Sequence, residues 1–497
     1  MISKTFSADG ALGKAIPGFQ PRQAQLDMAE AVLQAIEKQS QLVVEAGTGT
    51  GKTFAYLVPA LLSGKKTIIS TGSKNLQEQL FHRDLPLMVD ALGFYGQVAL
   101  LKGRSNYLCL DRLSRQMIES HGTHTDPTLL AQLVKVRSWS SATQTGDLGD
   151  CDDIAEDSPI IPTITSTNDN CLGKECPSYT DCFVLKARKK AMDSDVVVVN
   201  HHLFLADLAI KETGFGELIP EADVFIFDEA HHLADKAVQH FSSGFRFVSS
   251  VRWLQQLGTT MDTVQKQWSK ARRINHNIEQ IRHISTVILM QLNLLPDSLQ
   301  IYYDDIQNDD SSWKRSQNAR FPLDGVPDEL VSSGTELSEL FSQLGHHLSA
   351  IADEMQSVME SDPDEAELEQ WFPAFGAGST RAQSARTLFD FYSTAQQKRD
   401  VPRAYWISRI ESDAGVDYSM NCAPLLASSY LDELLWSRCA GATLTSATLT
   451  ALGSFDRIKT HTGLPDGALF EAVPSPFDYA KNAVLKVPLQ ACNPTDV

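Results

Sequence analysis

One segment limits the fold of this chain more than any other. It is Glu45-Ala-Gly-Thr-Gly-Thr-Gly-Lys-Thr53, which follows an apolar run and opens a helical pattern. Closely spaced glycines let backbone N–H groups curve around phosphate oxygens at the start of a helix. The segment therefore predicts an α/β domain that binds ATP. The residues expected to contact ATP here are Ala46, Gly47, Thr48, Gly49, Thr50, Gly51, Lys52 and Thr53.

Two side chains of this loop have distinct expected roles. Lys52 can reach the β- and γ-phosphates, and the Thr53 hydroxyl is placed to ligate Mg²⁺. Ala46 stands where the motif commonly has its first glycine, and it keeps a small residue at that position.

A second motif, Val224-Phe-Ile-Phe-Asp-Glu-Ala-His231, is an apolar run that ends in two carboxylates. Open α/β sheets place their ligands at the carboxyl ends of the strands. We expect Asp228 to hold Mg²⁺ and Glu229 to orient and activate the attacking water, since phosphoryl transfer depends on positioning and on charge stabilisation. A capped strand end is the alternative, and the phosphate loop upstream argues against it.

Strand-like and helical patterns alternate around these motifs. Helices are expected at Arg22–Ile36 and Thr53–Leu62, and buried parallel strands at Leu42–Val44, Thr67–Ser70, Val196–Val199, Val224–Phe227 and Thr443–Thr445. The pattern predicts a doubly wound parallel sheet. Two insertions interrupt it. The first, 102–195, holds most of the cysteines, and the second, 233–398, is helical, with one apolar face running from Leu337 to Val358.

Composition limits the compartment and the partners. The first residues have no signal-peptide pattern, and no apolar run approaches the roughly 18–20 residues that span a membrane. We therefore expect a cytoplasmic protein without a membrane partner. The net charge of −19 excludes a uniformly basic surface, so any contact with DNA must be local. Eight cysteines in a reducing compartment indicate metal or redox chemistry rather than disulfides.

Four cysteines are grouped by their spacing: Cys109 is followed by Cys171, Cys176 and Cys182. Four thiolates suit a [4Fe–4S] cluster, and a tetrahedral zinc site is the rival. The residues alone leave the two metals even. Cys151 lies in the same insertion without an assigned role, and Cys422, Cys439 and Cys492 are expected to be ordinary buried residues.

Aromatic and basic residues accompany these cysteines. Cations would meet phosphates while aromatic faces accept bases, which is a sequence-tolerant way to bind single-stranded DNA. The alternative is a solvated helix face with the aromatic rings packed inside, and the sequence does not separate the two. The candidates are Tyr107, Tyr179, Lys186, Arg188, Lys189 and Lys190.

Further segments resemble motifs of one helicase family. They are Phe19 with Arg22 and Gln25, Ser70–Ser73 with Gln77 and Gln79, Asn200-His201, Asp228–His231, Thr445–Leu449 and Ser475–Phe477. Together they resemble the XPD/DinG family of superfamily 2 iron–sulfur helicases, and within it the YoaA-like bacterial members.

The resemblance carries expectations for each part of the chain. It implies a RecA-like sheet, an arch-like helical insertion, a [4Fe–4S] cluster on the four grouped cysteines, and ATP-driven 5′-to-3′ unwinding of forked or single-strand-tailed DNA in repair or replication. It implies that Arg22 and Gln25 read the adenine. The residues that it assigns to coupling hydrolysis with movement are His231, Thr445, Ser446, Ala447 and Thr448.

The resemblance also divides the chain. We expect the first motor domain at 1–101, 196–232 and 399–480, and the start of a second at 481–497. Because that second domain does not continue past Val497, we expect a portion of a helicase that has little or no activity alone. The alternative is a non-motor module that binds ATP and single-stranded DNA.

Overall fold

The computed structural model describes most of the chain. The described residues are 2–119, 127–155, 157–167, 171–173, 176–213, 217–268, 272–309, 317–323, 325–361, 371–397, 401–412, 415–439, 441–477, 481, 484 and 486. They form two compact units, each assembled from separate stretches of sequence. Unit 1 comprises Met1–Lys102, Ala187–Ala237 and Ala427–Val497, and unit 2 comprises Gly103–Lys186 and Val238–Leu426.

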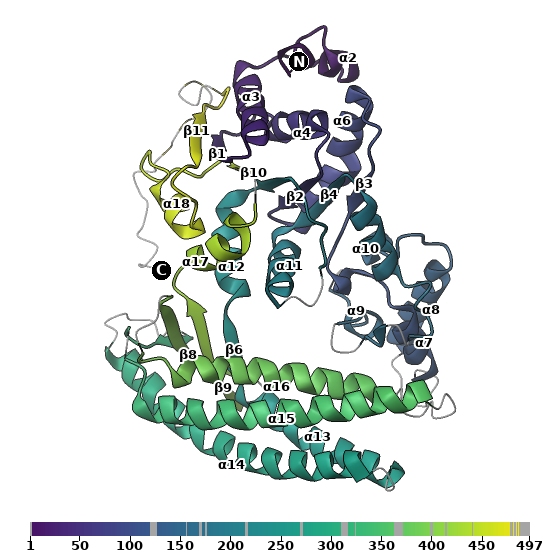
Figure 1. Ribbon diagram of the computed structural model, residues 1–497, viewed down its shortest axis with the longest axis vertical. Coiled ribbons are helices and arrows are strands. Elements are labelled where there is room, and N and C mark those ends of the chain that lie inside the picture. Colours follow the sequence, from purple (N-terminus) through teal and green to yellow (C-terminus); the bar gives the residue numbers. More distant parts are fainter. Residues whose placement is uncertain are drawn as a thin grey trace. The chain divides into compact units, whose positions relative to one another are not determined.

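Unit 1 is built on a seven-stranded sheet in which every neighbouring pair is parallel (Figure 1). Across the sheet the strands are β11 (Leu469–Val473), β1 (Gln41–Ala46), β10 (Gly441–Ser446), β5 (Val224–Asp228), β2 (Thr67–Thr71), β4 (Val196–Asn200) and β3 (Val98–Leu100). All five residues of β2 and of β4 are buried, as expected of strands covered on both faces. The predicted doubly wound α/β fold is confirmed.

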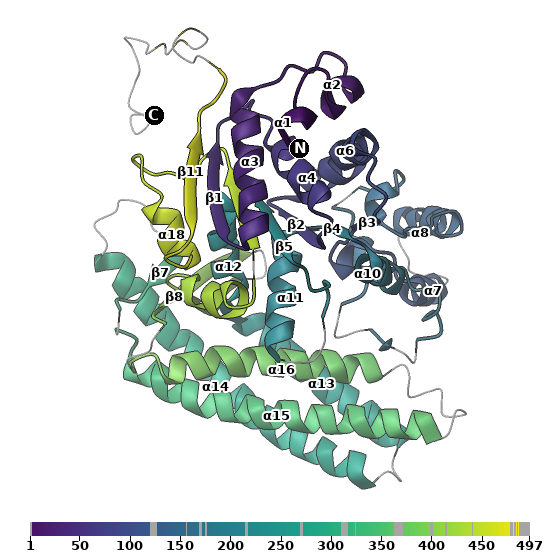
Figure 2. The ribbon, with the colours of Figure 1, turned by 45° about the horizontal axis from the view of Figure 1, so that its top comes forward.

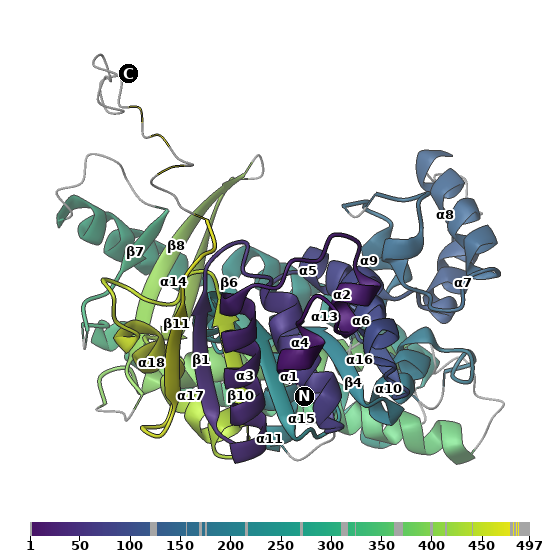
Figure 3. The same cartoon turned by 90° about the horizontal axis from the view of Figure 1, so that it is seen from above.

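Helices connect and cover these strands. Figure 3 shows α3 (Gln23–Lys38) lying along the sheet next to β1. The others around the sheet include α4 (Lys52–Ser63), α6 (Leu85–Leu92), α11 (His201–Thr213), α12 (Leu233–His240) and α18 (Asp456–Thr462). Their apolar residues join those of the strands in one core, in which Val44, Leu57 and Ile69 have no exposed surface.

Unit 2 contains long helices and a small antiparallel sheet. The helices, seen as parallel ribbons in Figure 2, are α13 (Phe247–Gln267), α14 (Arg272–Asp309), α15 (Asp328–Ser361) and α16 (Phe372–Ser393). The sheet has the order β6 (Ser243–Arg246), β9 (Gly415–Pro424), β8 (Arg403–Ser412) and β7 (Asn318–Arg320). The cysteine-bearing stretch of this unit contains α7 (Leu110–Glu119), α8 (Pro127–Ser140) and α9 (Ile161–Ile164).

The apolar face expected on the second insertion is present on α15. Leu337, Phe341, Leu344, Leu348, Ile351 and Met355 are all completely buried. They form one core with residues of α13, α14 and α16 and with strand residues such as Met420. The packing interpretation of this face is therefore confirmed for the residues whose side chains are described.

The expected boundary at 398/399 needs correction. Strands β8 and β9 pair over ten residues, from Arg403 opposite Pro424 to Ser412 opposite Gly415, and β9 also pairs with β6. Because these hydrogen bonds and the shared core tie both strands to the long helices, the second insertion extends to Leu426. In the part of the chain that the structure describes, no helix is both long enough and apolar enough to cross a membrane.

Candidate functional site

The phosphate loop lies between β1, which ends at Ala46, and α4, which begins at Lys52. Gly49 and Gly51 have φ values of +82° and +83°, in the left-handed region that glycine adopts without strain. A Cβ atom on Gly51 would lie 2.2 Å from Nε2 of Gln25. The glycines at these two positions are therefore required both by backbone conformation and by close packing.

Arg22 and Gln25 both contact the backbone of this loop. The Gln25 amide donates to the carbonyl oxygen of Gly51 at 3.0 Å, and the Arg22 guanidinium donates to that of Gly49. The Gln25 side chain is buried, at 3% exposure. The two residues expected to read adenine are thus placed at the phosphate loop, where they hold its backbone.

Asp228 ends β5 as a buried carboxylate, 8% exposed. Its Oδ2 atom accepts a hydrogen bond of 3.0 Å from the Tyr56 hydroxyl, and its Oδ1 accepts one of 3.0 Å from the backbone N–H of Glu229. Burial raises the pKa of Asp228 from 3.8 to about 6, and the Glu229 carboxylate adds to the rise. Tyr56 was not anticipated. It lies one helical turn after Thr53, and this spacing is the signal that could have suggested it.

Glu229 has a left-handed backbone, with φ of 52°, which is uncommon for a residue with a Cβ and is concentrated at functional sites. Its Oε2 atom accepts a 2.9 Å hydrogen bond from the Ser446 hydroxyl. The same hydroxyl lies 2.7 Å from Nδ1 of His231. Burial, followed by the neighbouring His232, lowers the pKa of His231, so its neutral imidazole can donate from Nδ1 to Ser446.

The other residues assigned to coupling lie on and after β10. Thr445 is completely buried, and its hydroxyl has no hydrogen-bond partner among the described residues. Ala447 follows the strand and is half-buried, and Thr448 is exposed and donates its backbone N–H to Ser446 Oγ at 3.4 Å. Of the five coupling residues, the structure brings Ser446 and His231 directly to Glu229.

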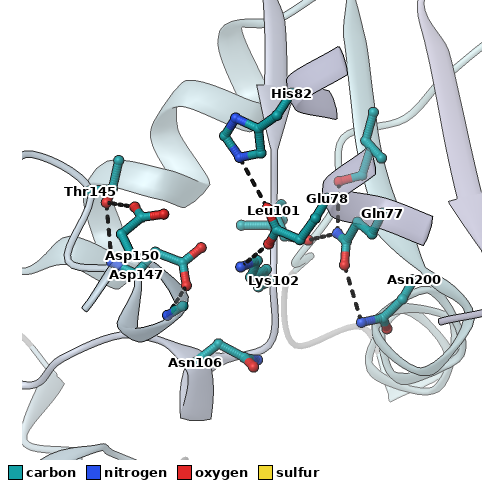
Figure 4. Close-up of polar contacts among 12 residues, drawn as sticks. Gln77, Glu78, His82, Leu101, Lys102, Asn106, Thr145, Asp147, Asp150 and Asn200 are labelled. Carbon is teal, nitrogen blue, oxygen red and sulfur yellow. Dashed lines mark hydrogen bonds and ion pairs between the residues drawn. The ribbon is translucent and has the colours of Figure 1, made fainter. Parts of the chain in front are cut away.

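Gln77 of α5 (Lys74–Gln79) is buried inside unit 1 (Figure 4). Its amide donates to the carbonyl oxygens of Leu101 and Val198 at 3.0 and 3.2 Å, and its oxygen accepts from Asn200 at 3.4 Å. The resemblance grouped Gln77 with Ser70–Ser73 and Gln79 in one helicase motif. Because both ends of its amide are used inside the protein, this side chain holds the ends of β3 and β4 together.

Glu78, the residue after Gln77, forms a charged cluster with His82 and Lys102. Figure 4 shows Glu78 between His82 and Lys102, with the imidazole 3.0 Å from one carboxylate oxygen and the Lys102 ammonium paired with the other. Lys102 is only 7% exposed. The pair with Glu78 offsets the cost of burying the Lys102 charge. Lys102 is the last residue of the first stretch of unit 1.

Asn200 and His201 join the ends of β2 and β4. Nδ1 of the fully buried His201 lies 2.7 Å from the Ser70 hydroxyl. Burial lowers the pKa of His201 to about 3, so the imidazole is neutral at physiological pH. We conclude that this histidine packs against β2 and orients it.

Ser475 and Phe477 lie against the phosphate loop. The Ser475 hydroxyl donates to the carbonyl oxygen of Thr48 at 2.9 Å. A Cβ atom on Gly49 would lie 2.2 Å from the Phe477 ring, so a side chain at this position would displace the ring. The segment that follows β11 therefore contacts the loop that is expected to bind ATP.

The four grouped cysteines are reduced and influence one another. Burial raises the pKa of Cys109, and the thiols of Cys182 and Cys171 raise it further; the Cys176 pKa is raised by burial and then by Cys109 and Cys171 among its neighbours. The donor chemistry fits a thiolate-bound cluster. Within the described residues, however, no three histidine, cysteine or acidic side chains are arranged to hold a metal ion.

The remaining cysteines behave as buried residues where they are described. Cys151 is 3% exposed, and the charged neighbours that raise its pKa beyond the effect of burial are Asp153 and Asp152. Cys422 and Cys439 are buried, as predicted, and Cys492 lies outside the described residues. The environment of Cys151 separates it from the four grouped thiols.

The residues proposed to contact DNA have different environments. Tyr107 is 3% exposed, so of the two alternatives left open by the sequence its ring fits the packed one, because a buried ring cannot receive a base. Tyr179 is 36% exposed. On α10 (Phe183–Asp193), Lys189 and Lys190 are exposed, Arg188 is half-buried, and Lys186 is 3.2 Å from Asp181.

A parallel sheet with a phosphate loop after β1 and an Asp-Glu pair after β5 defines a P-loop nucleotide-binding domain. Residues 24–125 match the family model described as DEAD/DEAH box helicase. "ATP-dependent DNA helicase YoaA" of Escherichia coli is 64% identical over 240 residues, covering 48% of this chain and 37% of that protein. The Haemophilus influenzae protein of the same name is 54% identical over 295 residues, covering 56% and 46%.

Similarity to DinG proteins extends further along the chain. "ATP-dependent DNA helicase DinG" of Photobacterium profundum is 29% identical over 513 residues, covering 97% of this chain and 71% of that protein. A solved structure titled "XPD_Helicase" aligns with 91% of this chain and 62% of its own at a TM-score of 0.43 and 14% identity. The chain is therefore similar to a DEAD/DEAH box helicase domain and to the YoaA and DinG helicases. It spans less than half the length of the two YoaA relatives.

Proposed function

We propose that this chain supplies the ATP-binding motor domain of a DNA helicase that unwinds forked or single-strand-tailed DNA in the 5′-to-3′ direction during repair or replication in the cytoplasm. The observation that carries the proposal is the joining of Asp228, Glu229, His231 and Ser446 at the strand ends beside a phosphate loop. The names of the YoaA and DinG relatives support DNA as the substrate.

The residues divide the chemistry among them. Backbone N–H groups of the loop and Lys52 bind the phosphates, while Thr53 and Asp228 would hold Mg²⁺, which supplies charge neutralisation at the phosphates when it is bound. The Tyr56 hydroxyl keeps Asp228 in place. Glu229 orients the attacking water, and Ser446 fixes the carboxylate that does so. His231 supports Ser446 from its other side.

We further propose that Cys109, Cys171, Cys176 and Cys182 hold a [4Fe–4S] cluster. The grouping of these four cysteines in the sequence and the family resemblance support this ligand set, and zinc is the less favoured metal. Tyr179, Lys186, Arg188, Lys189 and Lys190 are the candidate contacts to single-stranded DNA. Of these, Lys186, Lys189 and Lys190 are exposed and Tyr179 is 36% exposed, so their side chains are accessible to phosphates and bases.

Replacing Lys52 by Ala tests the nucleotide site. We expect ATP binding to weaken strongly and kcat for hydrolysis to fall by roughly 100-fold or more, because the charge at the β- and γ-phosphates is lost. Binding of a fluorescent ATP analogue and phosphate release measure the two effects. Lys38→Ala, at an exposed helix end, is the matched control. Equal ATP binding by Lys52→Ala and Lys38→Ala would contradict the proposed site.

Replacing Cys176 by Ser tests the cluster. After anaerobic purification we expect iron and labile sulfide near four each per chain in the unmodified protein. Cys176→Ser should lose both, together with single-stranded DNA binding, because one ligand is removed. Cys151→Ser is the matched control and should keep its iron, since that thiol lies in a different environment. Zinc in place of iron, or unchanged DNA binding by Cys176→Ser, would refute this part of the proposal.

A further inference from the structure

Glu45, the residue before the phosphate loop, makes three hydrogen bonds to the segment after β10. Its Oε2 atom accepts from the backbone N–H groups of Leu449 and Thr450, each at 2.6 Å. Its Oε1 accepts from the Thr450 hydroxyl at 3.0 Å. Hydrogen bonds to a carboxylate are stronger than those between neutral groups. No other side chain joins the strand of the phosphate loop to this segment by three bonds within the described residues.

The segment that Glu45 holds has little structure of its own. β10 ends at Ser446, and residues 447–450 belong to no helix or strand. Leu449 is buried, and the Thr448 N–H bonds back to Ser446 Oγ at 3.4 Å. Since a loop without a backbone ladder depends on side-chain contacts for its position, the Glu45 carboxylate fixes where this segment lies.

This segment begins directly after the residue that contacts the catalytic carboxylate. In the sheet, Glu45 lies opposite Ser446, and Ser446 donates to Glu229. Within the described residues, the Glu45 carboxylate makes its hydrogen bonds to Leu449 and Thr450 and not to Glu229. Its influence on hydrolysis therefore passes through residues 447–450 and Ser446.

We infer that Glu45 is a positioning residue that joins the phosphate loop to Ser446 and thereby holds Glu229 in place for hydrolysis. This inference rests on the proposed function and names a residue that the motif assignment left without a role. Because Ala46 and Gly47 follow Glu45 directly, a shift of the loop on binding nucleotide moves the carboxylate and the segment bound to it. Through the same contacts, a change of the phosphate loop on nucleotide binding also changes the position of the coupling residues.

Two substitutions separate positioning from direct catalysis. Glu45→Ala removes all three hydrogen bonds. Glu45→Gln keeps their geometry, because the amide oxygen can accept both N–H groups while the amide nitrogen donates to the Thr450 hydroxyl. Single-turnover hydrolysis should fall about 10–100-fold in Glu45→Ala with little change in ATP affinity, as expected when a reacting group is misplaced. Glu45→Gln should recover most of the rate.

A second readout does not depend on hydrolysis. Amide hydrogen exchange at Leu449 and Thr450 should become faster in Glu45→Ala and stay close to that of the unmodified protein in Glu45→Gln. Unchanged exchange in Glu45→Ala would overturn the inference, because it would show that Glu45 does not hold residues 449 and 450. Equal loss of hydrolysis in both variants would also overturn it, because the effect would then come from the lost charge and not from the lost hydrogen bonds. Failure of the unmodified chain to bind ATP would instead refute the proposed function.

Discussion

Replacement of Asp228 by Asn is expected to stabilise the nucleotide-free protein and to abolish its ATP hydrolysis. Burial and the Glu229 carboxylate raise the pKa of Asp228 from 3.8 to about 6, so the folded protein binds this proton more tightly than the unfolded chain does. Ionised Asp228 therefore destabilises the folded protein, and this loss of stability grows as the pH rises from about 4 and is complete above about 6. At about 1.4 kcal/mol per pKa unit, it reaches roughly 3 kcal/mol.

The expected difference between Asp228→Asn and the unmodified protein therefore depends on pH. Chemical denaturation without Mg²⁺ or nucleotide should show the gain in stability increasing from pH 5 to about 6.5 and then remaining constant. Asn can accept from the Glu229 N–H and donate to Tyr56, so the hydrogen bonds have a replacement. A gain that is independent of pH, or a loss of stability above pH 7, would contradict the assigned cause.

A second buried carboxylate provides the matched control. Asp207 is 2% exposed, but it accepts hydrogen bonds from the backbone N–H groups of Leu218 and Ile219 at 2.6 and 2.9 Å, and it pairs with Lys211 at 2.9 Å. Asp207→Asn should destabilise unit 1, because it leaves the Lys211 ammonium without its charged partner. A gain in stability for Asp228→Asn and a loss for Asp207→Asn would show that the contacts of each carboxylate, and not its burial alone, determine how the substitution changes stability.

Replacement of Phe341 by Ala is expected to destabilise unit 2 by about 3–5 kcal/mol, because it leaves a cavity in a closely packed core. The ring is completely buried, stacks on Phe389 with centroids 5.7 Å apart, and meets Phe245 edge to face at 5.7 Å. Denaturation followed by helical circular dichroism measures the loss. ATP binding should persist at temperatures where unit 2 has unfolded, because the core of unit 1 contains none of these residues.

Leu294→Ala serves as the control for this experiment. Leu294 lies on α14 of the same unit, but it is 72% exposed, so its truncation should change stability by less than about 0.5 kcal/mol. Equal effects of Phe341→Ala and Leu294→Ala would contradict the core described for unit 2. Loss of ATP binding in step with the unfolding of Phe341→Ala would show that the two units are not separately stable.

Periodicity and composition predicted the central strands well and the edge strands poorly. Runs such as Val196–Val199 are continuous and β-branched because both faces of β4 are covered. β3 has only three residues, and β11 has mostly exposed or half-buried side chains. Neither gives a long apolar run, so the sequence showed no strand there. The pairing of β8 with β9 was missed for a different reason: residues 403–424 follow the expected insertion and were assigned to the first motor domain.

In the candidate site, too, some residues could be predicted from the sequence and others could not. Lys52, Asp228 and Glu229 could be predicted because each stands at a fixed offset from a strand end. The contacts of Tyr56 with Asp228 and of Glu45 with Thr450 join residues far apart in sequence, and only the folded sheet brings them together. Gln77 and Tyr107 show the converse: a polar or aromatic residue in a suggestive motif was placed inside the protein, where it serves packing and hydrogen bonding.

The order of strands across the sheet has a consequence for biosynthesis. β10 lies between β1 and β5, so the strand bearing the phosphate loop and the strand bearing Asp228 cannot be joined until residues 441–446 leave the ribosome. At 5–20 residues per second, the synthesis between β5 and β10 takes roughly 10–40 s. During that interval both strands expose unpaired edges, while the long helices are already complete. The nascent chain therefore builds its inserted unit before its nucleotide pocket, and chaperones would have the most to protect in the half-finished sheet.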